Sequence, residues 1–184
     1  MSRIGIFMAD GCEEIEGLAV VDIVRRANMD ITMISINGKK EVTGSHNVVF
    51  LADTLAAEVD FEEFDAIVLP GGGVGTQNLA ADETVNQVIK KFAAEGKLVC
   101  AICAAPSVLG AAGILRGKEA TCYPGFEDKL TGASVSEDAV VTDGNIITGR
   151  GMGAAIPFAL EIVRYLQGEE AAEAIRSGIV YQGV

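Results

Sequence analysis

The segment LVCAICAAPSVL, residues 98–109, places a cysteine where a buried strand should end and a helix should begin. The apolar run before Cys103 predicts a strand, and Pro106 favours a helix start soon after it. A helix in that place directs free N–H groups and the positive end of its dipole at the sulfur, which lowers the pKa of a thiol. Small neighbours also suit a nucleophile elbow. The position alone allows either a working nucleophile or a buried core cysteine.

A run of glycines in LPGGGVG, residues 69–75, follows a second short apolar segment. Glycines after a strand let backbone amides approach a ligand or an oxyanion closely. The run has neither the G-x-G-x-x-G spacing of dinucleotide sites nor the Gly-Lys-Ser/Thr ending of phosphate loops. We therefore expect the amides of Gly72 and Ala104 to flank Cys103 as an oxyanion hole. The alternative is an ordinary tight turn.

A third candidate is Glu16, whose neighbours predict that it faces inward. Acidic residues in a first helical turn have an ordinary role beside the helix dipole, which accounts for Glu13 and Glu14, and Asp10 with Glu13 has capping-box spacing. The apolar stripe of the same helix consists of Glu16, Val20, Ile23 and Ala27. A carboxyl group on that stripe should have a raised pKa and could share its proton with a thiolate. The alternative is an exposed glutamate at a frayed helix start.

The cysteine spacing offers two further interpretations, a redox pair or half of a zinc site, at Cys100 and Cys103. Residues three apart in a strand lie roughly 10 Å apart, which is too far for a disulfide. A zinc site would need a second cysteine pair or paired histidines, and His46 is the only histidine in the chain. We expect no metal and no cofactor.

Composition sets the class of protein. The 184 residues are 49% hydrophobic and show no linker, which predicts one domain over residues 1–184. A net charge of -12 opposes binding to nucleic acid backbones and to anionic membranes. The N-terminus does not have the pattern of a signal sequence, and no apolar run approaches the ~20 residues of a membrane span. A cytoplasmic location is the expectation.

Strand and helix patterns alternate along the chain. Nearly continuous Val, Ile and Leu runs predict a mostly parallel sheet with helices on both faces, an α/β fold. The segment 39–53 reads as a small inserted β-hairpin with its turn near Gly44. Strands are expected at 3–8, 30–36, 64–70 and 97–102, with short ones in 119–123, 139–144 and 145–150; helices are expected at 13–28, 84–95, 104–112, 154–166 and 169–176. Ligand sites of such folds lie at the carboxyl ends of strands, where the loops ADGCEE, PGGGVG and CAAPS fall.

Four segments together resemble the ThiJ/PfpI superfamily, and within it the subgroup of the Parkinson disease-associated deglycase. They are ADGCEEIEGLAVVDIVRRA, FDAIVLPGGGVGTQNLA, LVCAICAAPSVLGAAGIL and TGRGMGAAIPFALEIV. The resemblance implies a flavodoxin-like three-layer sandwich and a homodimer formed through the first helix and the hairpin. It also implies that Cys103 is the reactive cysteine, that Glu16 hydrogen-bonds it, and that Gly72 and Ala104 supply the facing amides.

Two positions depart from relatives of this kind. The protease-like branch carries histidine directly after its cysteine, where this chain has Ala104, so peptidase activity is not expected. The deglycase subgroup often has histidine before the proline of the loop that here reads TCYPGFEDK, and this chain has Tyr123. The acid-base role then falls mainly on Glu16, with Tyr123 at most a hydrogen-bond donor and His46 not placed near the thiol by the sequence.

The resemblance implies a cofactor-independent lyase or hydrolase of the glyoxalase III or deglycase kind. Its substrates would be small dicarbonyls such as methylglyoxal and glyoxal, or glycated amino groups, with Cys103 as nucleophile and Glu16 as general acid and base. The alternative is a redox-sensing or stress-protective protein in which Cys103 is oxidised to a sulfinate held by Glu16 and the loop amides. A purely structural domain would leave the inward glutamate unexplained.

Overall fold

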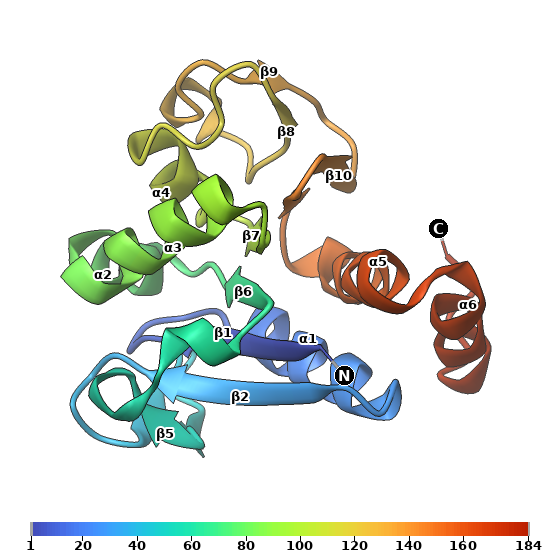
Figure 1. Ribbon diagram of the computed structural model, residues 1–184, viewed down its shortest axis with the longest axis horizontal. Helices are drawn as coiled ribbons and strands as arrows, with labels where there is room; N and C mark the ends of the chain where they lie inside the picture. Colours follow the sequence, from blue (N-terminus) through green and yellow to red (C-terminus); the bar gives the residue numbers. More distant parts are fainter. Residues whose placement is uncertain (1, 184) are drawn as a thin grey trace.

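The centre of the protein is a seven-stranded sheet in the order β10-β11-β7-β6-β1-β2-β5, seen edge-on in Figure 1. The computed structural model describes residues 2–183. Neighbouring strands of this sheet pair in parallel except β10, which is antiparallel to β11. The strands are β1 (Arg3–Met8), β2 (Asp30–Ser35), β5 (Thr54–Leu55), β6 (Ala66–Leu69), β7 (Leu98–Ile102), β10 (Val140–Asp143) and β11 (Ile146–Gly149).

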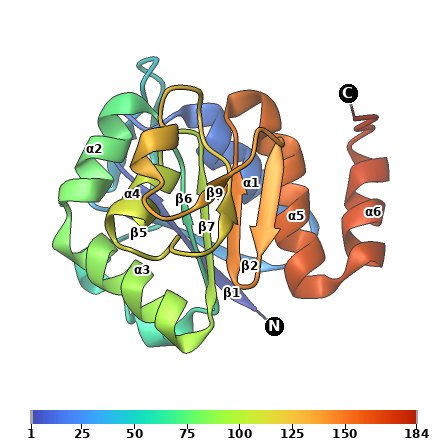
Figure 2. The ribbon, with the colours of Figure 1, turned by 90° about the horizontal axis from the view of Figure 1, so that it is seen from above.

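Helices cover both faces of the sheet. Figures 1 and 2 show α1 and α5 on one face, with α6 packed on α5, and α2, α3 and α4 on the other. The helices are α1 (Glu14–Arg26), α2 (Gly73–Ala81), α3 (Glu83–Glu95), α4 (Pro106–Ala111), α5 (Ala155–Gln167) and α6 (Glu169–Gly178). The three-layer α/β fold predicted from the alternating pattern is therefore confirmed.

The two faces of the sheet bury separate cores because side chains along a strand alternate between them. Ile4 and Ile6 of β1 pack with Phe158 of α5. Phe7, which directly follows Ile6, points to the opposite face and packs in the core that contains Phe92 of α3. All of these side chains are fully buried. Burial on both faces explains why the strand sequences are almost continuously apolar.

The strand order brings three loops to one edge of the sheet. From β1 the chain passes to β2 on one side, and the later strands β6 and β7 lie on the other side. In parallel strands the carboxyl ends share an edge, so the loops that follow β1, β6 and β7 meet near the point where the order reverses. These loops are residues 9–13, 70–72 and 103–105.

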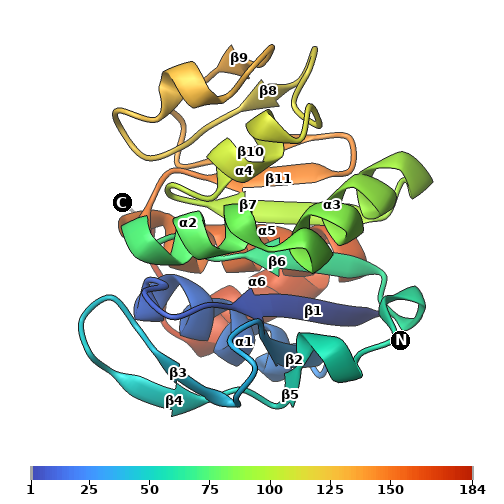
Figure 3. The same cartoon turned by 90° about the vertical axis from the view of Figure 1, so that its left-hand side faces the viewer.

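Several smaller elements lie outside the central sheet and its covering helices. The predicted hairpin is β3 (Glu41–Thr43) and β4 (Val49–Leu51), which pair antiparallel away from the main sheet, as Figure 3 shows. A second small sheet joins β8 (Glu119–Ala120) and β9 (Ser134–Val135). The 3-10 turns are η1 (Ala56–Glu58), η2 (Phe61–Glu63), η3 (Glu127–Lys129) and η4 (Met152–Ala154).

Three local predictions were wrong. The end of the glycine run, predicted only as a loop, begins α2 at Gly73. The helix after Cys103 was predicted from residue 104, but a turn occupies the first positions and α4 begins at Pro106. Asp10 does not cap α1, because its carboxylate accepts a hydrogen bond from the backbone N–H of Thr43 at 2.8 Å.

Within the described residues, no helix combines the length and the apolar character that a membrane crossing would require.

Candidate active site

Cys103 lies at a sharp turn directly after β7, and its backbone has the left-handed conformation with φ of 65°. This region is unfavourable for a residue with a side chain, at a cost on the order of 1–3 kcal/mol. Two hydrogen bonds fix the turn: the N–H of Cys103 donates to Gly149 at 2.9 Å, and the N–H of Tyr123 donates to the carbonyl of Cys103 at 2.8 Å. The turn has the geometry of a nucleophile elbow and presents a partly exposed thiol.

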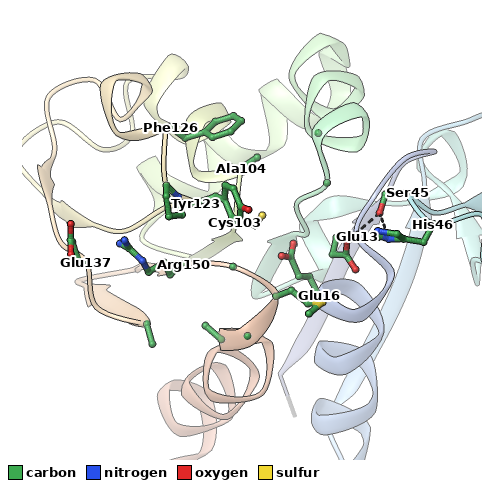
Figure 4. Close-up of a pocket in the computed structure, with 18 residues that line it drawn as sticks. Glu13, Glu16, Ser45, His46, Cys103, Ala104, Tyr123, Phe126, Glu137 and Arg150 are labelled. Carbon is green, nitrogen blue, oxygen red and sulfur yellow. Dashed lines mark hydrogen bonds and ion pairs between the residues drawn. The ribbon is translucent and has the colours of Figure 1, made fainter. Parts of the chain in front are cut away.

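Glu16 lies on the inward stripe of α1, as its spacing predicted, and is 0% exposed. The N–H of Gly71 donates to its Oε2 at 2.9 Å. Its other oxygen, Oε1, has no hydrogen-bond partner within residues 2–183. Figure 4 shows the carboxyl group directed from α1 toward the loop that carries Cys103. A buried acceptor without a partner is costly, so Oε1 is available for a proton from a thiol or from a bound ligand.

The glycine loop packs against both of these side chains and leaves no room for a larger residue. A Cβ atom added to Gly71 would lie 2.6 Å from Cβ of Cys103 and 2.6 Å from Oε2 of Glu16. Gly72 has φ of 91°, and a Cβ there would meet the carbonyl of Gly11 at 2.4 Å. The run is therefore more than a tight turn, because only glycine lets this backbone approach both Cys103 and Glu16 so closely.

Burial and mutual interaction shift the pKa of both groups. Desolvation raises the pKa of Glu16 to about 7, as its inward position predicted. The pKa of Cys103 is raised to about 12, first by desolvation and then by the charge and hydrogen bonding of Glu16. This corrects the prediction of a lowered thiol pKa: burial and the neighbouring carboxylate of Glu16 outweigh the backbone amides that lower the pKa of Cys103. The first proton lost near neutral pH therefore comes from Glu16.

The amides of Gly72 and Ala104 both direct hydrogen bonds at the sulfur of Cys103 and lower its pKa. These two N–H groups stabilise negative charge on the sulfur. They therefore favour the protonation state in which the thiol proton has moved to the carboxyl group of Glu16. No hydrogen bond of standard geometry joins Oε1 of Glu16 to the sulfur in the described chain, although each group shifts the pKa of the other. Contacts of this kind often tighten only when substrate binds.

The thiol opens into a pocket of about 850 Å³ between the sheet edge, the hairpin, the loop after β8 and the loops before β10 and α5 (Figure 4). Its wall includes all six residues proposed from the sequence, namely Glu16, His46, Gly72, Cys103, Ala104 and Tyr123. It also includes residues for which the sequence analysis proposed no role in the site, namely Glu13, Ser45, Gly73, Pro124, Phe126, Glu137, Ala139, Arg150, Gly151, Met152, Gly153 and Ala154.

Tyr123 and His46 occupy opposite sides of this pocket. Tyr123 is 50% exposed and lies against the backbone of Gly151. His46 is held by acidic residues of the helix start: its Nδ1 lies 3.2 Å from Glu14 and 3.5 Å from Glu13. The hydrogen bond with Glu14 and the charges of both glutamates raise the pKa of His46. In Figure 4 Glu13 lies between His46 and Cys103.

Glu14 has a structural role that its place in the first helical turn did not reveal. Its buried carboxylate accepts hydrogen bonds from the backbone N–H groups of His46 at 2.7 Å and Val48 at 3.4 Å. Burial by itself would raise its pKa, but these bonds and its own backbone N–H outweigh burial and lower the pKa to about 2. Glu14 thereby fastens the hairpin to α1, and Gly44 leaves room for it, since a Cβ there would lie 2.2 Å from Oε1 of Glu14.

One group of side chains within residues 2–183 has the composition of a metal site. Ligand atoms of Glu13, Glu14 and His46 lie within 4.8 Å of one another. The same atoms already bind one another and Ser45 through hydrogen bonds. These contacts explain the cluster as the anchor of the hairpin without a metal ion.

The fold and the elbow define a class of α/β proteins with a partly exposed cysteine on a sharp turn at the carboxyl edge of the sheet. Residues 2–165 match the DJ-1/PfpI family, and the chain belongs to that family. It is 37% identical over 177 residues to protein dj-1beta of Drosophila melanogaster, covering 95% of each chain. A deglycase of Pyrococcus abyssi is 33% identical over 167 residues, which cover 90% of this chain and 99% of that relative.

A solved structure shares the whole fold. Oxidized DJ-1 of Toxoplasma gondii superposes with a TM-score of 0.96 at 32% identity, covering 100% of both chains. Membership of the family and a deglycase among the relatives together suggest enzymatic activity for this chain. The family resemblance and flavodoxin-like fold expected from the sequence are confirmed.

Proposed function

We propose that the protein is a cofactor-independent, cysteine-dependent enzyme of the glyoxalase III and deglycase kind. Its substrates are methylglyoxal, glyoxal and early glycation adducts of amino groups. The observation that carries this proposal is the pairing of a partly exposed thiol, Cys103, with a buried carboxyl group, Glu16, whose pKa of about 7 suits proton exchange at neutral pH.

The first step joins sulfur to the aldehyde carbon of methylglyoxal. Ionised Glu16 accepts the thiol proton while the sulfur of Cys103 attacks, so that no free thiolate with its high pKa has to accumulate. Glu16 then passes this proton to the aldehyde oxygen as the C–S bond forms, which gives a hemithioacetal and leaves Glu16 ionised for the next step. The amides of Gly72 and Ala104, which already face the sulfur, stabilise the negative charge that passes between sulfur and oxygen.

The second step rearranges the hemithioacetal within the substrate. Glu16 removes the proton from the former aldehyde carbon and a proton is returned to the neighbouring carbon, which gives a thioester of lactate. One carbon is oxidised and the other reduced, so the step needs no external oxidant or reductant. Water then cleaves the thioester, releasing lactate and the thiol. The net reaction adds one water to methylglyoxal.

The same attack on a glycated amino group would release the amine and leave the carbon skeleton on sulfur. A deglycase among the relatives supports this extension, since the name of that protein states the activity. Tyr123, at the rim of the pocket, would contribute at most a hydrogen bond to the substrate.

The test is consumption of methylglyoxal by wild type and by Cys103→Ser, with lactate quantified. The proposal expects one lactate for each methylglyoxal consumed by wild type and no enzymatic lactate from the serine variant, because a serine hydroxyl is a far weaker nucleophile here. Equal lactate formation by both proteins would contradict it.

A second candidate function, redox sensing through oxidation of Cys103 to a sulfinate, is favoured by two observations. A close structural relative was solved in a form described as oxidized. The unpartnered Oε1 of Glu16, when protonated, could donate to a sulfinate oxygen, and the two amides could donate to the same group. Wild type that makes no lactate but binds two oxygen atoms on Cys103 after mild peroxide would favour this function over catalysis.

A further inference from the structure

Arg150 is the first residue after β11 and lies beside the elbow. β11 and β7 are parallel neighbours with Gly149 opposite Ile102, so Arg150 and Cys103 leave the sheet side by side. Neighbouring strands are about 4.8 Å apart. The backbone of Arg150 is fixed on both sides: Gly149 accepts the N–H of Cys103 at 2.9 Å, and the N–H of Arg150 donates to Ala139 at 2.9 Å. The side chain therefore starts from a rigid point next to the nucleophile.

Arg150 belongs to the wall of the Cys103 pocket, and in Figure 4 its guanidinium is directed toward Glu137, with which it forms no ion pair within 4.0 Å in the described residues. Within residues 2–183 no carboxylate oxygen lies within 4.0 Å of it, and it makes no side-chain hydrogen bond. Four other arginines are in ion pairs, namely Arg3, Arg25, Arg26 and Arg164. A half-buried arginine in the wall of a pocket, whose guanidinium forms no ion pair and no side-chain hydrogen bond in the described residues, is suited to an anionic ligand.

The pocket is also larger than methylglyoxal requires. Its volume of about 850 Å³ lies at the upper end of the roughly 300–1,000 Å³ that encloses drug-sized ligands. In Figure 4 Arg150 lies on the side of Cys103 away from Glu13 and His46, next to Tyr123. A substrate held by its aldehyde at Cys103 has room for a tail that extends along the pocket to the part of the wall that Arg150 and Glu137 form.

The charges around the pocket decide which anion fits. Besides Arg150, its wall contains the acidic residues Glu13, Glu16 and Glu137 and the imidazole of His46, whose pKa is raised by its contacts with Glu13 and Glu14. A dianionic phosphate would be repelled by the acidic residues, whereas a single carboxylate matches one guanidinium in charge and in its two-pronged geometry.

We propose that Arg150 is a specificity-determining residue that binds a carboxylate on the substrate, so that the preferred substrates are α-oxoaldehydes bearing a carboxylate tail. The proposal rests on the function proposed above. A representative substrate is 4,5-dioxopentanoate, which is methylglyoxal extended by a carboxymethyl group. Addition of one water with the same internal oxidation and reduction converts it to 2-hydroxyglutarate, so no co-reactant is needed.

The test uses two alkylating reagents of nearly equal size, iodoacetate and iodoacetamide, which differ in the carboxylate. Their rates at Cys103 are measured by peptide mass spectrometry on the intact protein. We expect Arg150→Gln to lower the ratio of the iodoacetate rate to the iodoacetamide rate by about 10-fold or more. Arg150→Lys keeps the charge but loses the planar fork, so its ratio of the two rates should lie between those of wild type and Arg150→Gln. Arg116→Gln, which removes an exposed guanidinium outside the pocket, should keep the wild-type ratio.

Three outcomes would contradict the proposal that Arg150 binds a carboxylate of the substrate. Arg150→Gln could slow both reagents by the same factor, which would make the residue a support for the loop. It could leave the ratio at the wild-type value. Inorganic phosphate could protect Cys103 from iodoacetamide at lower concentration than propanoate does, and lose this protection in Arg150→Gln, which would assign the subsite to phosphate esters.

Turnover separates this inference from the proposed function. We expect wild type to have a higher kcat/KM for 4,5-dioxopentanoate than for methylglyoxal, and Arg150→Gln to lose about 10-fold or more of that preference. A wild type that favours iodoacetate in an Arg150-dependent way but makes no hydroxy acid would refute the proposed function and support the subsite. If wild type makes lactate but Arg150→Gln keeps the same preference for 4,5-dioxopentanoate over methylglyoxal, the carboxylate subsite alone would be refuted.

Discussion

Replacing Glu16 by glutamine should remove activity and, at alkaline pH, stabilise the fold. Glutamine keeps the size of the side chain and can still accept the Gly71 hydrogen bond, but it cannot exchange a proton. Turnover of methylglyoxal should fall by roughly 100- to 10,000-fold, the range typical of losing a general acid or base. Wild-type kcat/KM should rise as pH increases through about 7, since the ionised carboxyl group accepts the thiol proton.

The effect on stability follows from the raised pKa of Glu16. Between pH 4.5 and about 7 the folded protein keeps a proton on this carboxyl group that the unfolded chain has lost. The unfolded state therefore binds fewer protons, and stability falls as pH rises through this window. Above about pH 7 the loss of folding stability is nearly complete. It amounts to about 3 kcal/mol, because each pKa unit corresponds to ~1.4 kcal/mol. Glutamine cannot ionise and avoids this loss.

Denaturant unfolding of wild type and Glu16→Gln at pH 5 and pH 8 measures the effect. The stability of the variant relative to wild type should improve by roughly 2 to 3 kcal/mol between the two pH values, because a small part of the loss has already occurred at pH 5. Packing differences of the glutamine cancel in this comparison because they are the same at both pH values. An improvement below about 1 kcal/mol would show that Glu16 does not carry a strongly raised pKa, and the proton exchange that we propose would lose its basis.

Three further predictions concern the loop, the other thiols and the surface. Gly71→Ala should abolish lactate formation while circular dichroism stays native, since its Cβ would displace Cys103 or Glu16; near-wild-type turnover would contradict the geometry. Mild peroxide should modify Cys103 before the three buried cysteines, and peptide mass spectrometry that finds the first added oxygens elsewhere would oppose this. We also propose a homodimer through α1 and the hairpin, where Ile15 and Leu51 are exposed, and light scattering near 19.1 kDa at micromolar concentration would refute it.

Much of the fold could be predicted because local patterns agreed with it. The doubly buried strands have a continuous apolar signal, and the order in which they alternate with helices implies a parallel sheet. The same reasoning placed Glu16, because a carboxylate on the apolar stripe of a helix has to face the core. It also brought the loops of Gly72 and Cys103 to one edge, since carboxyl ends of parallel strands meet there.

The parts that could not be predicted depend on contacts between distant segments. Glu14 fastens the hairpin through backbone N–H groups more than thirty residues away, which no local spacing encodes. The pKa of Cys103 has the opposite direction from the prediction because desolvation and Glu16 outweigh two amides, a balance set by packing. Arg150 was within reach of sequence reasoning, since it directly follows a predicted strand at the same edge as Cys103.

The central claim is that Cys103 and Glu16 share one proton that is lost near neutral pH, and the rate of Cys103 alkylation by iodoacetamide between pH 5 and pH 10 tests it most directly. In wild type the rate should rise through about pH 7 and then level off, because loss of the shared proton creates a fixed small fraction of thiolate. In Glu16→Gln this step should disappear, leaving only the ionisation of the thiol itself. Identical profiles for the two proteins, with no step near pH 7, would contradict the account.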